Sequence, residues 1–139
     1  MDKSEMKMLA LAEKYYKPKT LAHAVRVAEY ALADFNLYKY DVDKSLLFNV
    51  ALAHDLLEDT DCPPEDIKDI VAGLGMNAVT LLTRVEGVTY KDYIEQIVSS
   101  ENLYAIIVKR ADMKDHLMRT DTLTDKLKEK YFPVLGLLI

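Results

Sequence analysis

The segment from His54 to Thr60, HDLLEDT, brings together the side chains best suited to chemistry. It holds one imidazole and, at Asp55, Glu58 and Asp59, three carboxylates, all of which can bind divalent metals. On a continuous helix these four side chains would lie within an arc of roughly 140°. Acidic side chains at a helix C-terminus are disfavoured by about 0.3–1 kcal/mol each, because the helix dipole is negative there. The segment therefore suggests a compensating cation, such as a bound divalent metal; the alternative is a solvated acidic helix end.

Two further histidines, His23 and His116, and an aspartate, Asp112, lie in other segments with helical patterning. A lone histidine on an apolar helix face is more often a hydrogen-bonded core or surface residue than a metal ligand. The order along the chain is more informative than any single residue. A histidine on one helix precedes a His-Asp pair on the next helix and an aspartate on a later one, which favours one shared site.

The elements that must position these residues are predicted to be helices, since apolar residues recur at helical spacing and no segment alternates as a strand does. Thr20, Asp43 and Thr124 are placed to cap the helices that follow them. Gly73 and Gly75 are expected to bracket a turn between two helices. The expected helices span residues 5–16, 20–36, a third from 43 that carries His54-Asp55, 64–72, 76–85, 91–99, 102–118 and a last one from 124. We predict a single all-α domain over residues 1–139.

The composition is that of an ordinary globular protein of 139 residues with a formal net charge of −5, which argues against general nucleic-acid binding. Cys62 is the only cysteine, so no intrachain disulfide can form and a reducing compartment is expected. No apolar run approaches the ~20 residues that a membrane span needs. We therefore expect a cytoplasmic protein that acts on a small molecule, without a nucleic-acid or membrane partner. The apolar residues 137–139 are compatible with a homodimer.

The order H…HD…D resembles that of the HD phosphohydrolase superfamily, which is all-α and binds a divalent metal. Within it, HDLLEDT is similar to the His-Asp-x-x-Glu-Asp-Thr motif of RelA/SpoT-type (p)ppGpp hydrolase domains. The segments 108–112 (VKRAD), 82–84 (LTR) with 90–97, and 127–135 also look like stretches of that family. The resemblance extends from about His23 to Tyr131. It implies an HD-type helical bundle with a metal site among three helices.

The resemblance also implies roles for individual residues. The metal ligands would be His23, His54, Asp55 and Asp112, holding one divalent ion. Mn²⁺ is the leading candidate from the family, and Fe²⁺, Co²⁺, Ni²⁺ or Zn²⁺ would also suit these ligands. The acidic pair Glu58 and Asp59 would orient or deprotonate the attacking water; the alternative for both is plain surface charge.

Substrate contacts are expected from Lys109, His116, Lys19 and Tyr131. Lys109 lies one turn before Asp112 and so shares its helix face. Tyr131 would either stack on a base or anchor the last helix to the core. Arg26 and Arg84 are further candidates, each with a solvated charge or a local ion pair as the alternative.

The leading prediction for function is a metal-dependent phosphohydrolase, namely a small stand-alone (p)ppGpp 3′-pyrophosphohydrolase. Two features depart from that family: the stretch from Tyr16 to His23 is shorter than the family's approach segment, and His116 stands where the family has asparagine. They leave open an HD-domain nucleotidase or nucleoside triphosphate hydrolase. The alternative from another class is a metal-binding nucleotide sensor with little turnover.

Overall fold

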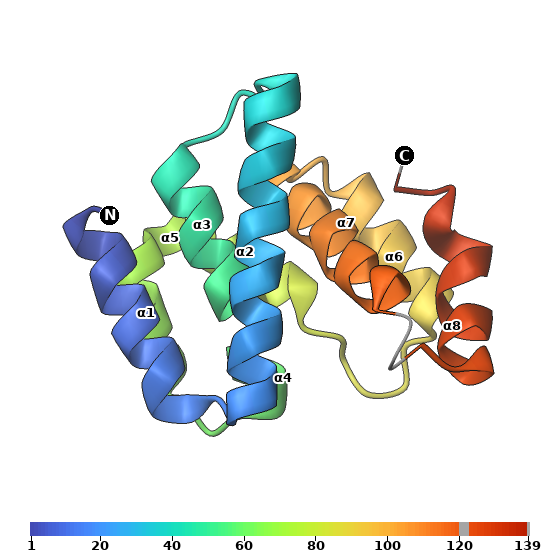
Figure 1. The fold of residues 1–139 in the computed structure, drawn as a ribbon, viewed down its shortest axis with the longest axis horizontal. Coiled ribbons are helices and arrows are strands. Elements are labelled where there is room, and N and C mark those ends of the chain that lie inside the picture. Colours follow the sequence, from blue (N-terminus) through green and yellow to red (C-terminus); the bar gives the residue numbers. More distant parts are fainter. Residues whose placement is uncertain (120–122, 139) are drawn as a thin grey trace.

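The computed structural model describes residues 1–119 and 123–138, and these residues form helices without any β-strand (Figure 1). The all-α class predicted from the sequence is therefore confirmed. The helices are α1 (Lys3–Tyr15), α2 (Pro18–Tyr38), α3 (Lys44–Ala53), α4 (Leu56–Asp59), α5 (Pro64–Leu82), α6 (Tyr90–Ser99), α7 (Leu103–Met118) and α8 (Asp125–Leu135). None of them is both long enough and apolar enough to cross a membrane.

Helix α2 occupies the centre of the arrangement. It packs against both α3 and α7; in Figure 1, α1 and α3 lie to one side of it, α6, α7 and α8 lie to the other, and α5 passes behind it. Buried apolar side chains from both groups form one hydrophobic core, which includes Val27 of α2, Leu52 of α3 and Ile107 of α7. The three helices that were predicted to hold the metal ligands are thus fixed to one another by the core.

Helix α2 begins earlier than predicted. Its N-cap is Lys17, which makes no side-chain cap hydrogen bond, and Pro18 is the first helical residue. The prediction that Thr20 caps this helix was wrong, because the fixed φ of proline suits the first helical position and starts the helix there. The other two predicted caps are confirmed: the Asp43 side chain accepts from the Leu46 amide, and the Thr124 side chain accepts from the Leu127 amide.

The HDLLEDT segment is not one continuous helix, which corrects the assumption of a single helical arc. Helix α3 ends at Ala53, His54 is its C-cap, and Asp55 adopts φ −105° and ψ 0° before the short helix α4. The hydroxyl of Tyr16 fixes this bend from the α1–α2 connection. It donates to the Leu52 carbonyl at 2.7 Å and accepts from the Asp55 amide at 3.2 Å.

The predicted turn at Gly73 and Gly75 lies instead at Ala72, within α5. Ala72 has φ 59° and ψ −169°, a conformation that residues with a Cβ rarely adopt. Gly75 serves close packing, because a Cβ placed there would lie 2.4 Å from the Val71 Cβ and 2.8 Å from Leu46 Cδ1. The following helical part ends at Leu82, before the predicted end at residue 85.

Candidate metal centre

Side chains from α2, from the break between α3 and α4, and from α7 converge on one place. The Nε2 atom of His23 lies 2.8 Å from Asp112 Oδ1 and 3.8 Å from Asp55 Oδ2. The Nε2 atom of His54 lies 3.2 Å from Asp55 Oδ2 and 3.4 Å from Asp112 Oδ1. The structure therefore brings all four predicted metal ligands together, with two imidazole nitrogens and two carboxylate oxygens facing one another.

The orientation of His54 leaves its inner nitrogen free for a ligand role. Its Nδ1 lies 2.6 Å from the Ala51 carbonyl oxygen, which can only accept, so Nδ1 carries the proton and Nε2 has a lone pair when the ring is neutral. Nε2 is buried and has no hydrogen-bond partner among the described residues. A buried polar atom without a partner is unfavourable, and a cation between His54, Asp55 and Asp112 would satisfy it. The residues present thus fit a divalent metal.

His23 is oriented by an acidic residue that the sequence analysis missed. Its Nδ1 lies 2.6 Å from Oδ2 of Asp115, which is 1% exposed. Asp115 is in turn held by Arg26, whose Nε donates to Asp115 Oδ1 at 2.7 Å. A carboxylate behind a ligating histidine fixes its tautomer and raises its basicity. Arg26 therefore pairs with Asp115 and does not line the main pocket described below.

The electrostatics show how strongly opposite charges attract one another at this site. Burial lowers the pKa of His54, but the carboxylates of Asp55 and Asp112 outweigh it and raise the pKa well above the usual range. Burial raises the pKa of Asp112, but Lys109 and the neighbouring histidines outweigh it and hold the pKa well below the usual range. The cluster thus keeps its carboxylates ionised and ready to face a cation.

The predicted acid–base pair lies next to the ligand cluster. Carboxylate oxygens of Asp55, Glu58 and Asp59 lie within 4.8 Å of one another. Glu58 Oε1 accepts from the backbone amide of Arg84 at 2.9 Å, which ties α4 to the loop after α5. Partial burial, with the negative charges of Asp55 and Glu58, raises the pKa of Asp59. Both side chains are exposed to the pocket that opens above the ligand cluster.

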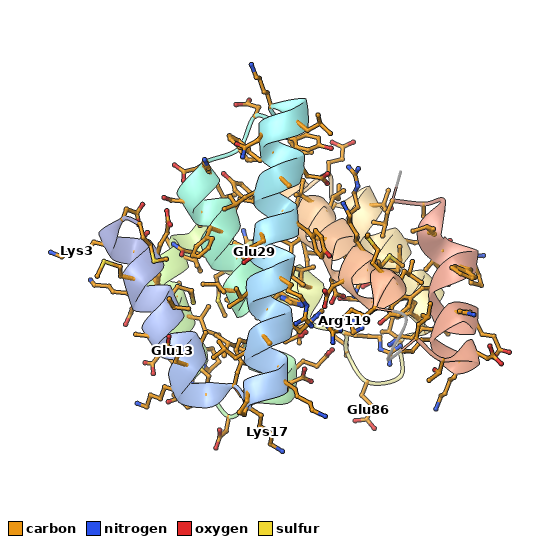
Figure 2. The ribbon with its side chains drawn as sticks, viewed as in Figure 1. Lys3, Glu13, Lys17, Glu29, Glu86 and Arg119 are labelled. Carbon is orange, nitrogen blue, oxygen red and sulfur yellow. The ribbon has the colours of Figure 1, made fainter. Side chains whose placement is uncertain are left out.

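This pocket has a volume of about 420 Å³, within the range of small-molecule sites. Asp55 and Asp112 lie on its lining together with the predicted substrate contacts Lys109, His116, Lys19 and Tyr131. Its other lining residues are Thr20, His23, Glu58, Asp59, Leu82, Arg84, Tyr90, Tyr93, Leu127 and Lys130. Figure 2 shows that Glu86, in the loop after α5, points away from the helices, whereas Arg84 of the same loop lines the pocket.

Positive charges gather around one aromatic ring of the pocket wall. The side-chain charges of Arg84, Lys109 and Lys130 lie 5.7, 5.3 and 4.7 Å from the centre of the Tyr90 ring. Lys109 is buried, and its Nζ lies 2.7 Å from Asp112 Oδ2. Partial burial and the neighbouring Lys109 and Arg84 charges lower the pKa of Lys130. An anion in the pocket would relieve the repulsion among these cations.

Tyr131 is only 3% exposed, and neighbouring rings cover it. His116 is stacked on it with ring centres 5.3 Å apart at 15°, and Tyr90 meets it edge-on at 5.6 Å. This burial favours the anchoring role of Tyr131 over base stacking, although the residue borders the pocket. Tyr90 and Lys130 were not among the predicted site residues; the resemblance of segment 90–97 was the one signal that could have pointed to Tyr90.

Comparison with known proteins gives a match at the level of structure. No family model matches the sequence, and no curated protein matches it either. Among solved structures, the chain is similar to a metazoan ortholog of SpoT that hydrolyses ppGpp, with a TM-score of 0.69 and 20% sequence identity. The match covers 99% of this chain and 84% of that one. The chain therefore has the fold of the RelA/SpoT-type hydrolase domain, an HD-type helical bundle.

Proposed function

We propose that this protein is a metal-dependent phosphohydrolase acting on a nucleotide, and that its reaction is the removal of the 3′-pyrophosphate of ppGpp. The observation that carries the proposal is the convergence of His23, His54, Asp55 and Asp112 at a pocket with a cationic wall, where all but the buried His54 lie on the lining. The fold shared with a metazoan SpoT ortholog that hydrolyses ppGpp supports the choice of substrate. ppGpp carries two diphosphate groups, so its negative charge suits this wall.

The four ligands would hold one divalent ion, with Mn²⁺ as the first candidate. When bound, the ion would polarise a phosphoryl oxygen and lower the pKa of a bound water towards ~7. Glu58 is fixed by the Arg84 amide and can orient the attacking water. The Asp59 carboxylate lies beside it and accepts no hydrogen bond from the described residues, so it is available to take the proton.

Substrate phosphates would be bound by the cations around Tyr90. Lys109 is anchored to Asp112, so it presents its charge at a fixed place between the ligand cluster and the wall. Arg84 and Lys130 come from a loop and from α8 and extend the positive surface outwards. Lys19, at the start of α2, supplies a further cation on the pocket lining. A substrate with several phosphates can contact more of these cations than a nucleoside monophosphate can.

The test is the release of pyrophosphate and phosphate by the Mn²⁺-loaded protein from ppGpp, GTP, GMP and dAMP. We expect pyrophosphate from ppGpp, and we expect it to disappear in Asp55→Ala. The matched control is Asp34→Ala. A carboxylate oxygen of Asp34 lies 3.7 Å from a guanidinium nitrogen of Arg110, and neither residue lines the pocket. Phosphate from GMP or dAMP alone would move the protein to the nucleotidases. Bound metal and nucleotide without turnover of any substrate would favour a sensor.

A further inference from the structure

Three imidazoles surround one carboxylate oxygen of the candidate metal centre. Oδ1 of Asp112 lies 2.8 Å from His23 Nε2, 3.4 Å from His54 Nε2 and 3.4 Å from His116 Nε2. His23 and His54 belong to the predicted ligand set, whereas the sequence predicts His116 to be a substrate contact. Its nitrogen is as close to the Asp112 oxygen as that of His54. By distance, His116 is therefore placed like a ligand of the same centre.

The ring of His116 is held in place on two sides. It stacks on Tyr131 at 15°, and its centre lies 4.7 Å from that of His23. Because His116 follows Asp112 by four residues on α7, both side chains leave the helix on the same face. The His116 side chain is 35% exposed, so it stands between the ligand cluster and the open pocket. The arrangement holds Nε2 of His116 facing the Asp112 carboxylate.

Hydrogen bonding alone does not explain this gathering of nitrogens. Hydrogen bonds from His23 and His116 would use both lone pairs of Asp112 Oδ1 and leave nothing for His54. His54 Nε2 already faces the cluster without a hydrogen bond. A cation near Asp112 Oδ1 would instead let each Nε2 donate its lone pair, so that all three nitrogens near this oxygen would have a partner.

We propose that His116 is a third imidazole ligand of this metal centre, which makes the donor set richer in nitrogen and shifts its preference from Mn²⁺ towards later ions such as Co²⁺. The proposal rests on the metal centre of the proposed function and adds a ligand to it. Imidazole suits Fe, Ni and Zn, and affinities of such sites rise from Mn²⁺ to Co²⁺ and beyond, whereas carboxylates suit Mn²⁺. Removal of the third imidazole should therefore weaken Co²⁺ binding more than Mn²⁺ binding.

The first experiment measures Co²⁺ and Mn²⁺ affinities by competition with a chelating dye, for the natural protein and His116→Asn. We expect the Co²⁺ affinity to fall by at least about 10-fold, because removal of even a residue that only supports a metal ligand typically lowers the affinity that much. The Mn²⁺ affinity should fall less. Lys114→Asn, on an exposed position of the same helix, is the control and should change neither affinity. Circular dichroism of the metal-free variants checks that each one folds.

The second experiment tests ligation directly and does not depend on turnover. The visible d–d absorption of bound Co²⁺, which depends on its ligands, should differ between the natural protein and His116→Asn and should be unchanged in Lys114→Asn. If the natural protein binds neither ion, the metal centre itself is refuted, and this proposal with it. If it binds both ions but His116→Asn changes neither the affinities nor the Co²⁺ absorption, the centre stands and the role of His116 is refuted.

Discussion

Replacement of Asp115 by asparagine should weaken metal binding although Asp115 would not touch the metal. The Asp115 carboxylate accepts from Arg26 on one oxygen and faces His23 Nδ1 at 2.6 Å on the other. Asparagine keeps one oxygen but loses the negative charge, and its amide nitrogen cannot accept from His23. His23 would then be less basic and free to turn. Losses of this kind reduce metal affinity by about 10–100-fold, or about 1.4–2.7 kcal/mol.

The assay is Mn²⁺ affinity by competition with a chelating dye, with Asp34→Asn as the matched control. Asp34 lies on α2 and pairs with Arg110 of α7, so its replacement also removes an ion pair between these two helices without touching a ligand. The melting temperature of the metal-free proteins separates weaker binding from poorer folding. An affinity for Asp115→Asn within two-fold of the control would refute the reasoning. A complete loss of binding would show instead that Asp115 is itself a ligand.

Further changes test other parts of the structure. Glu58→Ala should keep the metal, measured by elemental analysis, and reduce turnover by about 10²–10⁴-fold if Glu58 acts on the water; full activity would exclude that role. Lys109→Met should lower the unfolding free energy of the metal-free protein in urea by about 3–5 kcal/mol, because buried Asp112 loses its cation. Added metal should restore part of that loss, and an equal loss with and without metal would contradict the argument. Ala72→Gly should raise the unfolding free energy by about 1–3 kcal/mol by relieving the positive φ, whereas Gly75→Ala should lower it by about 1–3 kcal/mol through overpacking; unchanged urea midpoints would contradict both.

The sequence predicted the helices better than it predicted their breaks. Asp43 and Thr124 could be recognised as caps because a cap is a local hydrogen bond within three residues. The break between α3 and α4 at His54 and Asp55 contains no glycine or proline from which it could have been predicted. It is fixed by the Tyr16 hydroxyl, which binds backbone atoms 36 and 39 residues away. A contact of that range leaves no trace in the local pattern.

The sequence predicted those residues of the candidate metal centre that belong to a recognisable motif, and it missed Asp115, which does not belong to one. His23, His54, Asp55 and Asp112 follow a recognisable order, and the structure brings them together. Asp115 could not be found in this way, because an acidic residue on a helix usually faces solvent. Its partner His23 lies 92 residues earlier, and only the packing of α2 against α7 joins them.

The charges of the pocket are separated in a way that links metal and substrate. The carboxylates of Asp55, Glu58 and Asp59 lie together at α4, whereas Arg84, Lys109 and Lys130 surround Tyr90. A divalent ion held by His23, His54, Asp55 and Asp112 would offset the negative charge beside α4, and a bound phosphate group would offset the positive charge around Tyr90, so neither ligand alone would balance the pocket. Each ligand also attracts the other across a short distance, and coupling between two binding sites is reciprocal. The proposed function therefore predicts that metal and a nucleotide phosphate bind together more tightly than either binds alone.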